Sequence, residues 1–164
     1  MVLKIIIVII FSVVAAFIIN TIEELRKNNV DKISFKESID LTNLPVITFY
    51  QDGVKLNFLF DTGATLSVIN EKVINSIKVT KSDKISQTSG INGEIIDNIP
   101  NVQITFNYKD KSFTDDFQVI DMTKIFTSIK EATGVNVHGL IGSVFMQKYK
   151  YVLDFKEMIA YSKK

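Results

Sequence analysis

The sequence predicts an all-β domain, a barrel or a sandwich, that is preceded by an apolar N-terminal helix. From Ile39 onward, short apolar runs are separated by turn residues at regular intervals, which is the pattern of an all-β domain. Asn92-Gly93 is the strongest local signal for a hairpin turn. Ile5–Ile19 is apolar except for Ser12, which indicates a helix outside the folded domain. The chain of 164 residues leaves room for one domain beside this helix.

Composition and charge exclude several classes of function. The chain has 19 Lys and Arg against 18 Asp and Glu, so there is no basic excess to neutralise the phosphates of a nucleic acid. It contains no cysteine, which excludes disulfides, thiol catalysis and thiolate metal sites. Its single histidine, His138, excludes a multi-histidine metal site. We therefore expect no metal and no nucleic-acid partner.

The segment Ile5–Ile19 is expected to cross a membrane once. Its 15 residues span about 22 Å as a helix, and flanking residues extend it toward the roughly 30 Å hydrocarbon core. We interpret residues 1–22 as an uncleaved signal anchor, because the apolar run continues to Ile19. The alternative is a signal peptide cleaved at the small residues Val14-Ala15-Ala16. Signal-like segments usually insert with the N-terminus inside, so the domain is expected outside the cytoplasm, in the periplasm.

The remaining elements follow from apolar alternation and turn chemistry. Residues 23–38 are polar and are expected to form a stalk before a domain of residues 39–164. The expected strands are Pro45–Tyr50, Val54–Phe60, Ser67–Ile69, Val102–Phe106, Phe113–Ile120, Tyr151–Phe155 and Met158–Tyr161. Turns at residues 51–53 and 109–111 join two of the expected hairpins, and a further hairpin spans Ile85–Ile96. The expected helices are Met122–Ala132, which stops at Gly134, and Ser143–Lys150.

The most informative local feature is the tripeptide Asp61-Thr62-Gly63 at the end of an apolar strand. The Thr62 hydroxyl can fix this turn by hydrogen bonding, and Gly63 allows another backbone to approach closely. The tripeptide alone is weak evidence, because short triplets arise by chance at average composition. It is equally compatible with an ordinary turn between two strands.

Further features follow it in a characteristic order. Thr88–Glu94 contains Gly90, Ile91, Asn92 and Gly93 and looks like a flap hairpin. The residues Leu140-Ile141-Gly142 come next, followed by a short helix and a final strand. This order over roughly residues 40–164 resembles the retropepsin-like aspartic proteases, and most closely their bacterial single-domain branch.

The resemblance implies a retropepsin-like acid protease barrel with a flap and one short C-terminal helix. It implies that Asp61 is catalytic, that Thr62 crosslinks two such loops, and that Gly63 completes the turn. It implies that the flap closes over an extended peptide, so that Ala64, Gly90, Ile91, Asn92 and Gly93 are the expected substrate-binding residues. It also implies that Leu140, Ile141 and Gly142 pack behind the catalytic loop, and that no cofactor is required.

The chain departs from the family pattern in some places. Thr65 stands where relatives often carry Asp or Ser, so a dimer contact of the family is missing. His138 stands where bacterial relatives often have Asp, and we interpret it as a loop residue. Asp115 and Asp116 lie in a hairpin and are expected to be solvated, whereas Asp154 is expected to be structural.

Peptide hydrolysis of this kind needs two carboxylates that share one proton. The chain contains one Asp-Thr-Gly, so a symmetric homodimer with Asp61 from each copy is expected. The sequence thus predicts a membrane-tethered aspartic endopeptidase. One alternative is an inactive, membrane-anchored binding module with the same fold. Another is a phosphoryl-transfer enzyme with Asp61 as nucleophile, but the second acidic residue and the βαβ pattern expected for it are missing.

Overall fold

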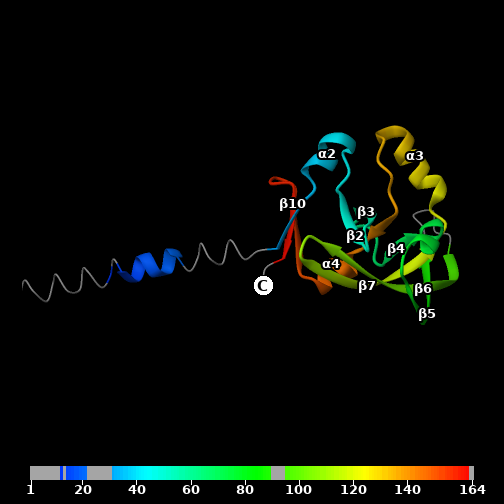
Figure 1. Ribbon diagram of the computed structural model, residues 1–164, viewed down its shortest axis with the longest axis horizontal. Coiled ribbons are helices and arrows are strands. Elements are labelled where there is room, and N and C mark those ends of the chain that lie inside the picture. Colours follow the sequence, from blue (N-terminus) through cyan, green and yellow to red (C-terminus); the bar gives the residue numbers. More distant parts are fainter. Residues whose placement is uncertain (1–11, 13, 22–30, 90–94, 163–164) are drawn as a thin grey trace, which may run out of the picture.

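The protein folds mostly into β-strands in a computed structural model that describes residues 12, 14–21, 31–89 and 95–162 (Figure 1). The strands are β1 (Asp31–Ser34), β2 (Val46–Gln51), β3 (Val54–Phe60), β4 (Ser67–Asn70), β5 (Thr80–Ser89), β6 (Ile95–Tyr108), β7 (Lys111–Ile120), β8 (Gly139–Ile141), β9 (Tyr151–Asp154) and β10 (Ile159–Ser162). The helices are α2 (Lys36–Thr42), the short 3-10 helix η1 (Glu71–Ser76), α3 (Thr123–Thr133) and α4 (Ser143–Lys148), and residues 14–21 are also helical. The predicted mostly-β class is confirmed.

Two hairpins form where the turn residues predicted them. β2 and β3 pair antiparallel from Val46↔Leu59 to Gln51↔Val54. Asp52 and Gly53 between them have φ angles of 49° and 84°, which is the backbone that a two-residue hairpin turn requires. β6 and β7 pair in the same way around Lys109, whose φ is 55°. The predicted strand boundaries of β3 are those of the structure.

The main sheet closes into a barrel. Its strand order is β2-β3-β8-β4-β7-β6-β5, and β2 also pairs with β6 at Tyr50↔Asn107. β8 is the short central strand, parallel to β3 and antiparallel to β4. β5 pairs with β6 outside the closed ring, so the β5–β6 hairpin projects from the barrel, at the lower right of Figure 1.

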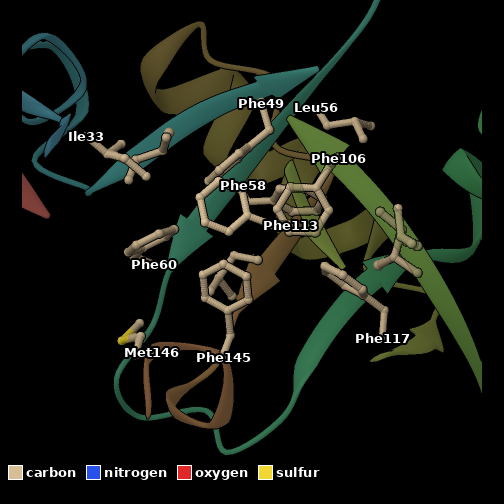
Figure 2. Close-up of a cluster of buried hydrophobic side chains, with 14 of the residues drawn as sticks. Ile33, Phe49, Leu56, Phe58, Phe60, Phe106, Phe113, Phe117, Phe145 and Met146 are labelled. Atoms are coloured by element: carbon tan, nitrogen blue, oxygen red, sulfur yellow. The ribbon is translucent and has the colours of Figure 1, made fainter. Parts of the chain in front are cut away.

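Phenylalanine side chains fill the barrel (Figure 2). Phe49, Phe58 and Phe106 are fully buried, and the ring centroids of Phe49 and Phe106 lie 5.0 Å apart in an edge-to-face arrangement. Such a pair contributes about 0.5–1.5 kcal/mol beyond the burial of its surface. Phe145 of α4 packs into the same cluster, with its ring 5.7 Å from that of Phe113. The core therefore ties α4 to the strands that carry the predicted catalytic loop.

A second sheet of three strands, β1-β10-β9, packs against the barrel. Ile33 of β1 and Ala160 of β10 are buried in the main core, and Phe35 next to β1 is 1% exposed. Ile33 and Phe35, which belong to the predicted stalk, are therefore part of the folded unit. The predicted domain start at residue 39 is too late, because Ile33 on β1 and Phe35 just after it are buried in the core, although their neighbours in the sequence are polar.

Helix α3 covers the barrel near β2, where Phe126 packs with Val46 and Val137. It ends at Gly134, whose φ is 76° and whose N–H donates to the carbonyl oxygen of Lys130, as the sequence predicted. Within the residues that the structure describes, no helix is long and apolar enough to span a membrane. Most of the predicted anchor, including residues 1–11, lies outside those residues.

Candidate active site

The loop after β3 carries Asp61 to the surface. Leu56, Phe58 and Phe60 point into the core from alternate positions of β3, so the strand is firmly held up to the residue before Asp61. The N–H of Gly63 donates a 2.8 Å hydrogen bond to Oδ1 of Asp61. The carboxylate therefore closes its own turn, and one of its oxygens has a fixed direction.

The glycine of this turn has little space for a side chain. A Cβ atom at position 63 would lie 3.2 Å from Oδ1 of Asp61, which is tighter than ordinary contact. A larger residue there would press directly on the carboxylate. A Cβ atom at position 63 would thus require the Asp61 carboxylate to shift by a few tenths of an ångström.

The segment Leu140–Gly142 lies behind the Asp61 loop, as the sequence predicted. β8 runs parallel to β3 with Leu59↔Leu140 and Phe60↔Ile141 paired. A Cβ atom on Gly142 would lie 2.6 Å from the carbonyl carbon and oxygen of Leu66, so only glycine fits between the two backbones. Leu140 and Ile141 are buried, and they support the loop from the core side.

Hydrogen bonds join the two segments along their length. The N–H of Asp61 donates to the carbonyl of Ile141 at 3.0 Å, and that of Ser143 donates to the carbonyl of Ala64 at 2.8 Å. The N–H of Val144 donates to the carbonyl of Thr65 at 3.1 Å. The first turn of α4 is therefore bound to the catalytic loop, which restricts its movement.

The solvent side of the loop is open. Asp61 and Ala64 are half-buried, whereas Thr62, Gly63 and Thr65 are exposed. The carboxylate is accessible to a water molecule, a substrate or a second protein chain. An exposed hydroxyl at Thr62 is also placed to contact a partner rather than the core.

The predicted flap is described in its stem alone. β5 and β6 form a long antiparallel ladder up to Ser89↔Ile95, and Gly90, Ile91, Asn92 and Gly93 lie outside the described residues. The stem carries exposed apolar side chains: Ile85 is 69% exposed, Ile95 63% and Ile96 47%. Such side chains are available for contact with another molecule.

The expectation that Asp115 is solvated is wrong. Asp115 is 7% exposed, with Phe113 and Phe117 buried on the same face of β7. Its carboxylate accepts hydrogen bonds from Oγ of Ser67 at 3.1 Å and from Nζ of Lys148 at 3.3 Å. Burial raises the pKa of Asp115, while Lys148 and Ser67 oppose this shift by stabilising the charged form.

Ser67 and Lys148 were not among the site residues expected from the sequence. A usable signal was nevertheless present, because Asp115 alternates with Phe113 and Phe117 and therefore falls on the core face of its strand. Its neighbour Asp116 lies on the opposite face and is half-buried.

His138 is a structural residue at the start of β8. Its Nδ1 accepts a 2.9 Å hydrogen bond from the backbone N–H of Asn57, so the neutral ring carries its proton on Nε2. Burial lowers the pKa of His138. Asp154 is also structural: its Oδ1 accepts from the backbone N–H groups of Lys156 and Glu157, which closes the turn between β9 and β10.

No group of three or more His, Cys, Asp or Glu residues that could hold a metal ion occurs among the described residues. The site chemistry is that of one half-buried carboxylate on a loop that is hydrogen-bonded to β8 and α4. That arrangement suits proton transfer to and from a bound molecule.

Comparisons with known proteins place this arrangement in a wider context. Residues 46–145, more than half of the chain, match the family model described as aspartyl protease. Among the curated proteins, none matches the chain. Among solved structures, the chain is similar to the EIAV protease complexed with the inhibitor HBY-793, with a TM-score of 0.48 and 18% identity over 68% of this chain and 93% of that chain. It is also similar to a retropepsin-like aspartic protease from Rickettsia conorii, with a TM-score of 0.49 and 15% identity over 82% of this chain and 91% of that chain.

Proposed function

Because this chain belongs to the aspartyl protease family, as its sequence motifs predicted, we propose that it is an endopeptidase whose active site is completed by a second copy of the chain. Each copy contributes Asp61. The substrate is an extended segment of a peptide or protein that lies between the two Asp61 loops and the β5–β6 hairpins.

The observation that carries the proposal is the single, exposed Asp-Thr-Gly loop. The chain has one such tripeptide, whereas water-mediated peptide hydrolysis needs an ionised and a protonated carboxylate side by side. Asp61 is half-buried and Thr62 exposed, so the loop is open to an identical loop across a two-fold axis. A homodimer supplies the missing carboxylate from the same residue.

In the proposed reaction, the ionised Asp61 takes a proton from a water molecule, whose oxygen attacks the scissile carbonyl carbon. The protonated Asp61 of the other copy donates a hydrogen bond and then its proton to the carbonyl oxygen. As the tetrahedral intermediate collapses, the Asp61 that took the proton of water gives it to the leaving nitrogen and the C–N bond breaks. The other Asp61 takes back the proton of one hydroxyl of the intermediate, so that a carboxylic acid forms and the pair again shares one proton. The hydrogen bond from Gly63 to Asp61 holds one carboxylate oxygen in place throughout.

A mixing experiment tests the shared site in the full-length chain in detergent micelles. Asp61→Asn alone should fold and cleave no peptide from a library. In an equal mixture, random pairing places half of the wild-type copies in mixed dimers, so they should show about half their own activity. Full activity of the wild-type copies in the mixture, under conditions of subunit exchange, would exclude a shared dyad. A folded wild-type chain that cleaves nothing would favour the inactive binding module.

We also propose that the apolar segment Ile5–Ile19 remains attached and holds the domain at a membrane, outside the cytoplasm. Two copies confined to one membrane meet at a higher effective concentration, which favours the dimer. Mass spectrometry of protein from the membrane fraction should find the N-terminal residues intact. Mature protein that begins at Phe17 and is free in solution would instead identify a cleaved signal peptide.

A further inference from the structure

Asp115 is a buried carboxylate below the Asp61 loop, and the proposed reaction does not use it. Burying a charged group is costly unless it is paired and hydrogen-bonded, and the other core-facing residues of β7, such as Phe113 and Phe117, are apolar. Barrel packing alone therefore gives no reason for a carboxyl group at this position. The contacts of Asp115 give one.

The first contact leads to Ser67, which is 2% exposed. The Ser67 hydroxyl donates to Oδ2 of Asp115 at 3.1 Å and accepts from the N–H of Gly142 at 3.2 Å. A hydroxyl has a single hydrogen, and Asp115 holds it. The lone pairs of Ser67 are thereby turned toward Gly142, in the segment that lies behind the catalytic loop.

This link differs from the other hydrogen bonds that join the two segments. The bonds from Asp61, Ser143 and Val144 connect backbone to backbone and form with almost any side chain. The bond from Gly142 needs the hydroxyl of Ser67, and the orientation of that hydroxyl needs an acceptor at residue 115. It lies at the glycine whose backbone leaves no room for a Cβ atom beside Leu66.

The second contact of Asp115 leads to the other end of α4. Nζ of Lys148 bonds both Oδ1 of Asp115, at 3.3 Å, and the carbonyl oxygen of Thr114, at 2.6 Å. The N–H of Ser143, at the first turn of α4, bonds Ala64 in the catalytic loop. Lys148 thus holds Asp115 from the last residue of α4, while the first residue of α4 bonds the loop without Asp115.

We propose that Asp115 is a positioning residue for the reaction: through the Ser67 hydroxyl it fixes the Gly142 backbone, and with it the placement of the Asp61 loop. This inference rests on the proposed endopeptidase function. It assigns no contact with substrate to Asp115 or Ser67. Their effect is on the geometry of the carboxylate pair, which must be held closely for proton transfer.

The kinetic test uses the full-length chain with Ser67→Ala, Asp115→Leu, which removes the acceptor, and the double variant, each normalised to folded dimer. Either single change should lower kcat roughly tenfold with KM within about twofold, because the loop loses its placement but keeps its substrate contacts. The double variant should be no worse than Ser67→Ala, since Asp115 acts through Ser67. The control is Asp116→Leu, the same substitution on the other face of β7, which should leave kcat unchanged.

A second measurement does not depend on catalysis. Ile141-Gly142 is the one Ile-Gly pair in the sequence, so labelling isoleucine carbonyls with ¹³C and glycine nitrogens with ¹⁵N identifies the Gly142 amide by NMR. Its hydrogen exchange should be faster in Ser67→Ala and in Asp115→Leu, and unchanged in Asp116→Leu.

The two measurements separate the possible failures. If the wild-type chain proves inactive on every peptide, the proposed function fails, and the Gly142 amide alone decides whether Asp115 holds this segment. Unchanged exchange at Gly142 in both single variants would overturn the proposal. Faster exchange with kcat unchanged would also overturn it, because the role would then be purely structural. Losses in kcat that add in the double variant would overturn it as well, because Asp115 would then act independently of Ser67.

Discussion

The backbone N–H of Asp61 donates a hydrogen bond to the carbonyl oxygen of Ile141 over 3.0 Å. This bond directly continues the parallel pairing of β3 with β8, whose last paired residues are Phe60 and Ile141. Asp61, the proposed catalytic residue, is therefore the first residue beyond a central, buried strand pair. Its backbone is as well fixed as the sheet, while its side chain reaches the surface, which is the combination that a rigid catalytic carboxylate needs.

The close approach at Gly142 leads to a first prediction. In Gly142→Ala the new Cβ would lie 2.6 Å from the backbone of Leu66 and 2.7 Å from the carbonyl oxygen of Thr65, so the catalytic loop must move. We expect a loss of about 1–3 kcal/mol in the free energy of unfolding, measured by urea denaturation, together with a loss of peptidase activity.

The matched control is Gly134→Asn at the end of α3. Nothing lies within 4 Å of a Cβ there, and asparagine tolerates the positive φ of 76°. This variant should keep nearly full stability and activity. Equal effects of the two substitutions would show that the contact between Gly142 and the loop is unimportant.

A second prediction concerns acid and the single histidine. Burial lowers the pKa of His138 from its ordinary 6.5, and protonation would remove the acceptor of the Asn57 N–H. As the pH falls below 6.5, His138 of the unfolded chain binds a proton while His138 of the folded chain stays neutral. The free energy of unfolding therefore falls with falling pH. The stabilisation that depends on neutral His138 is complete above the pKa of His138 in the unfolded chain, and it is lost as the pH falls below that pKa.

Urea denaturation at about pH 7.5 and about pH 5.5 measures this effect. His138→Asn keeps an acceptor but does not titrate, so it should lose less stability than the wild type between the two pH values. All other titrating groups are shared by the two proteins. An equal loss in both would contradict the role assigned to His138.

A third prediction concerns the pH dependence of catalysis. Two Asp61 carboxylates brought together cannot both ionise at low cost, so the pair should hold one proton over a wide range and give a bell-shaped profile of kcat. Ala64 carries no hydroxyl that could bond the ionised form, so we expect a mildly acidic optimum. Ala64→Ser supplies such a hydroxyl and should move the upper limb of the profile to lower pH.

The measurement is kcat against pH for both proteins where each remains dimeric. Ala64 is half-buried next to Asp61, and its backbone carbonyl bond to Ser143 does not involve the side chain, so the change should be tolerated. An optimum of the wild type at about pH 2, or an upper limb that moves upward in the variant, would refute this explanation.

A fourth prediction concerns the flap. The Asn92-Gly93 turn is expected to need positive φ angles, which valine does not adopt without strain. Gly93→Val should therefore reduce kcat/KM strongly while the thermal midpoint Tm changes little, since the projecting hairpin adds little to the core. The control is Ile96→Val in the stem, which should change neither quantity. Undiminished turnover of Gly93→Val would argue against a flap at these residues.

Local chemistry in the sequence was sufficient to predict much of this molecule. Alternating apolar residues predicted β3 and β7, Asp52-Gly53 predicted the first hairpin turn, and Gly134 predicted the end of α3. Each of these features depends on backbone preferences and on burial of one strand or helix face, which neighbouring residues determine. The order of the motifs then led from these elements to the family.

Other features depended on contacts between distant segments, which no local pattern encodes. β8 is three residues long and forms because β3 and β4 offer it partners on both sides. The residues of β1 belong to the predicted polar stalk, yet Ile33 is buried in the core. Short strands have little intrinsic stability, so pairing and burial by the rest of the fold decide where they form.

The sequence by itself predicted which residue carries the proposed chemistry, because an Asp-Thr-Gly turn after an apolar strand is a local property of Asp61 and its neighbours. Only the tertiary structure decided what holds that residue in place. Asp115 looks like one more surface carboxylate in the sequence, yet it is buried against Ser67 and Lys148, which come from two other parts of the chain. The reason is physical: a charge is tolerated in the core only where its partners converge, and that convergence exists once the chain has folded.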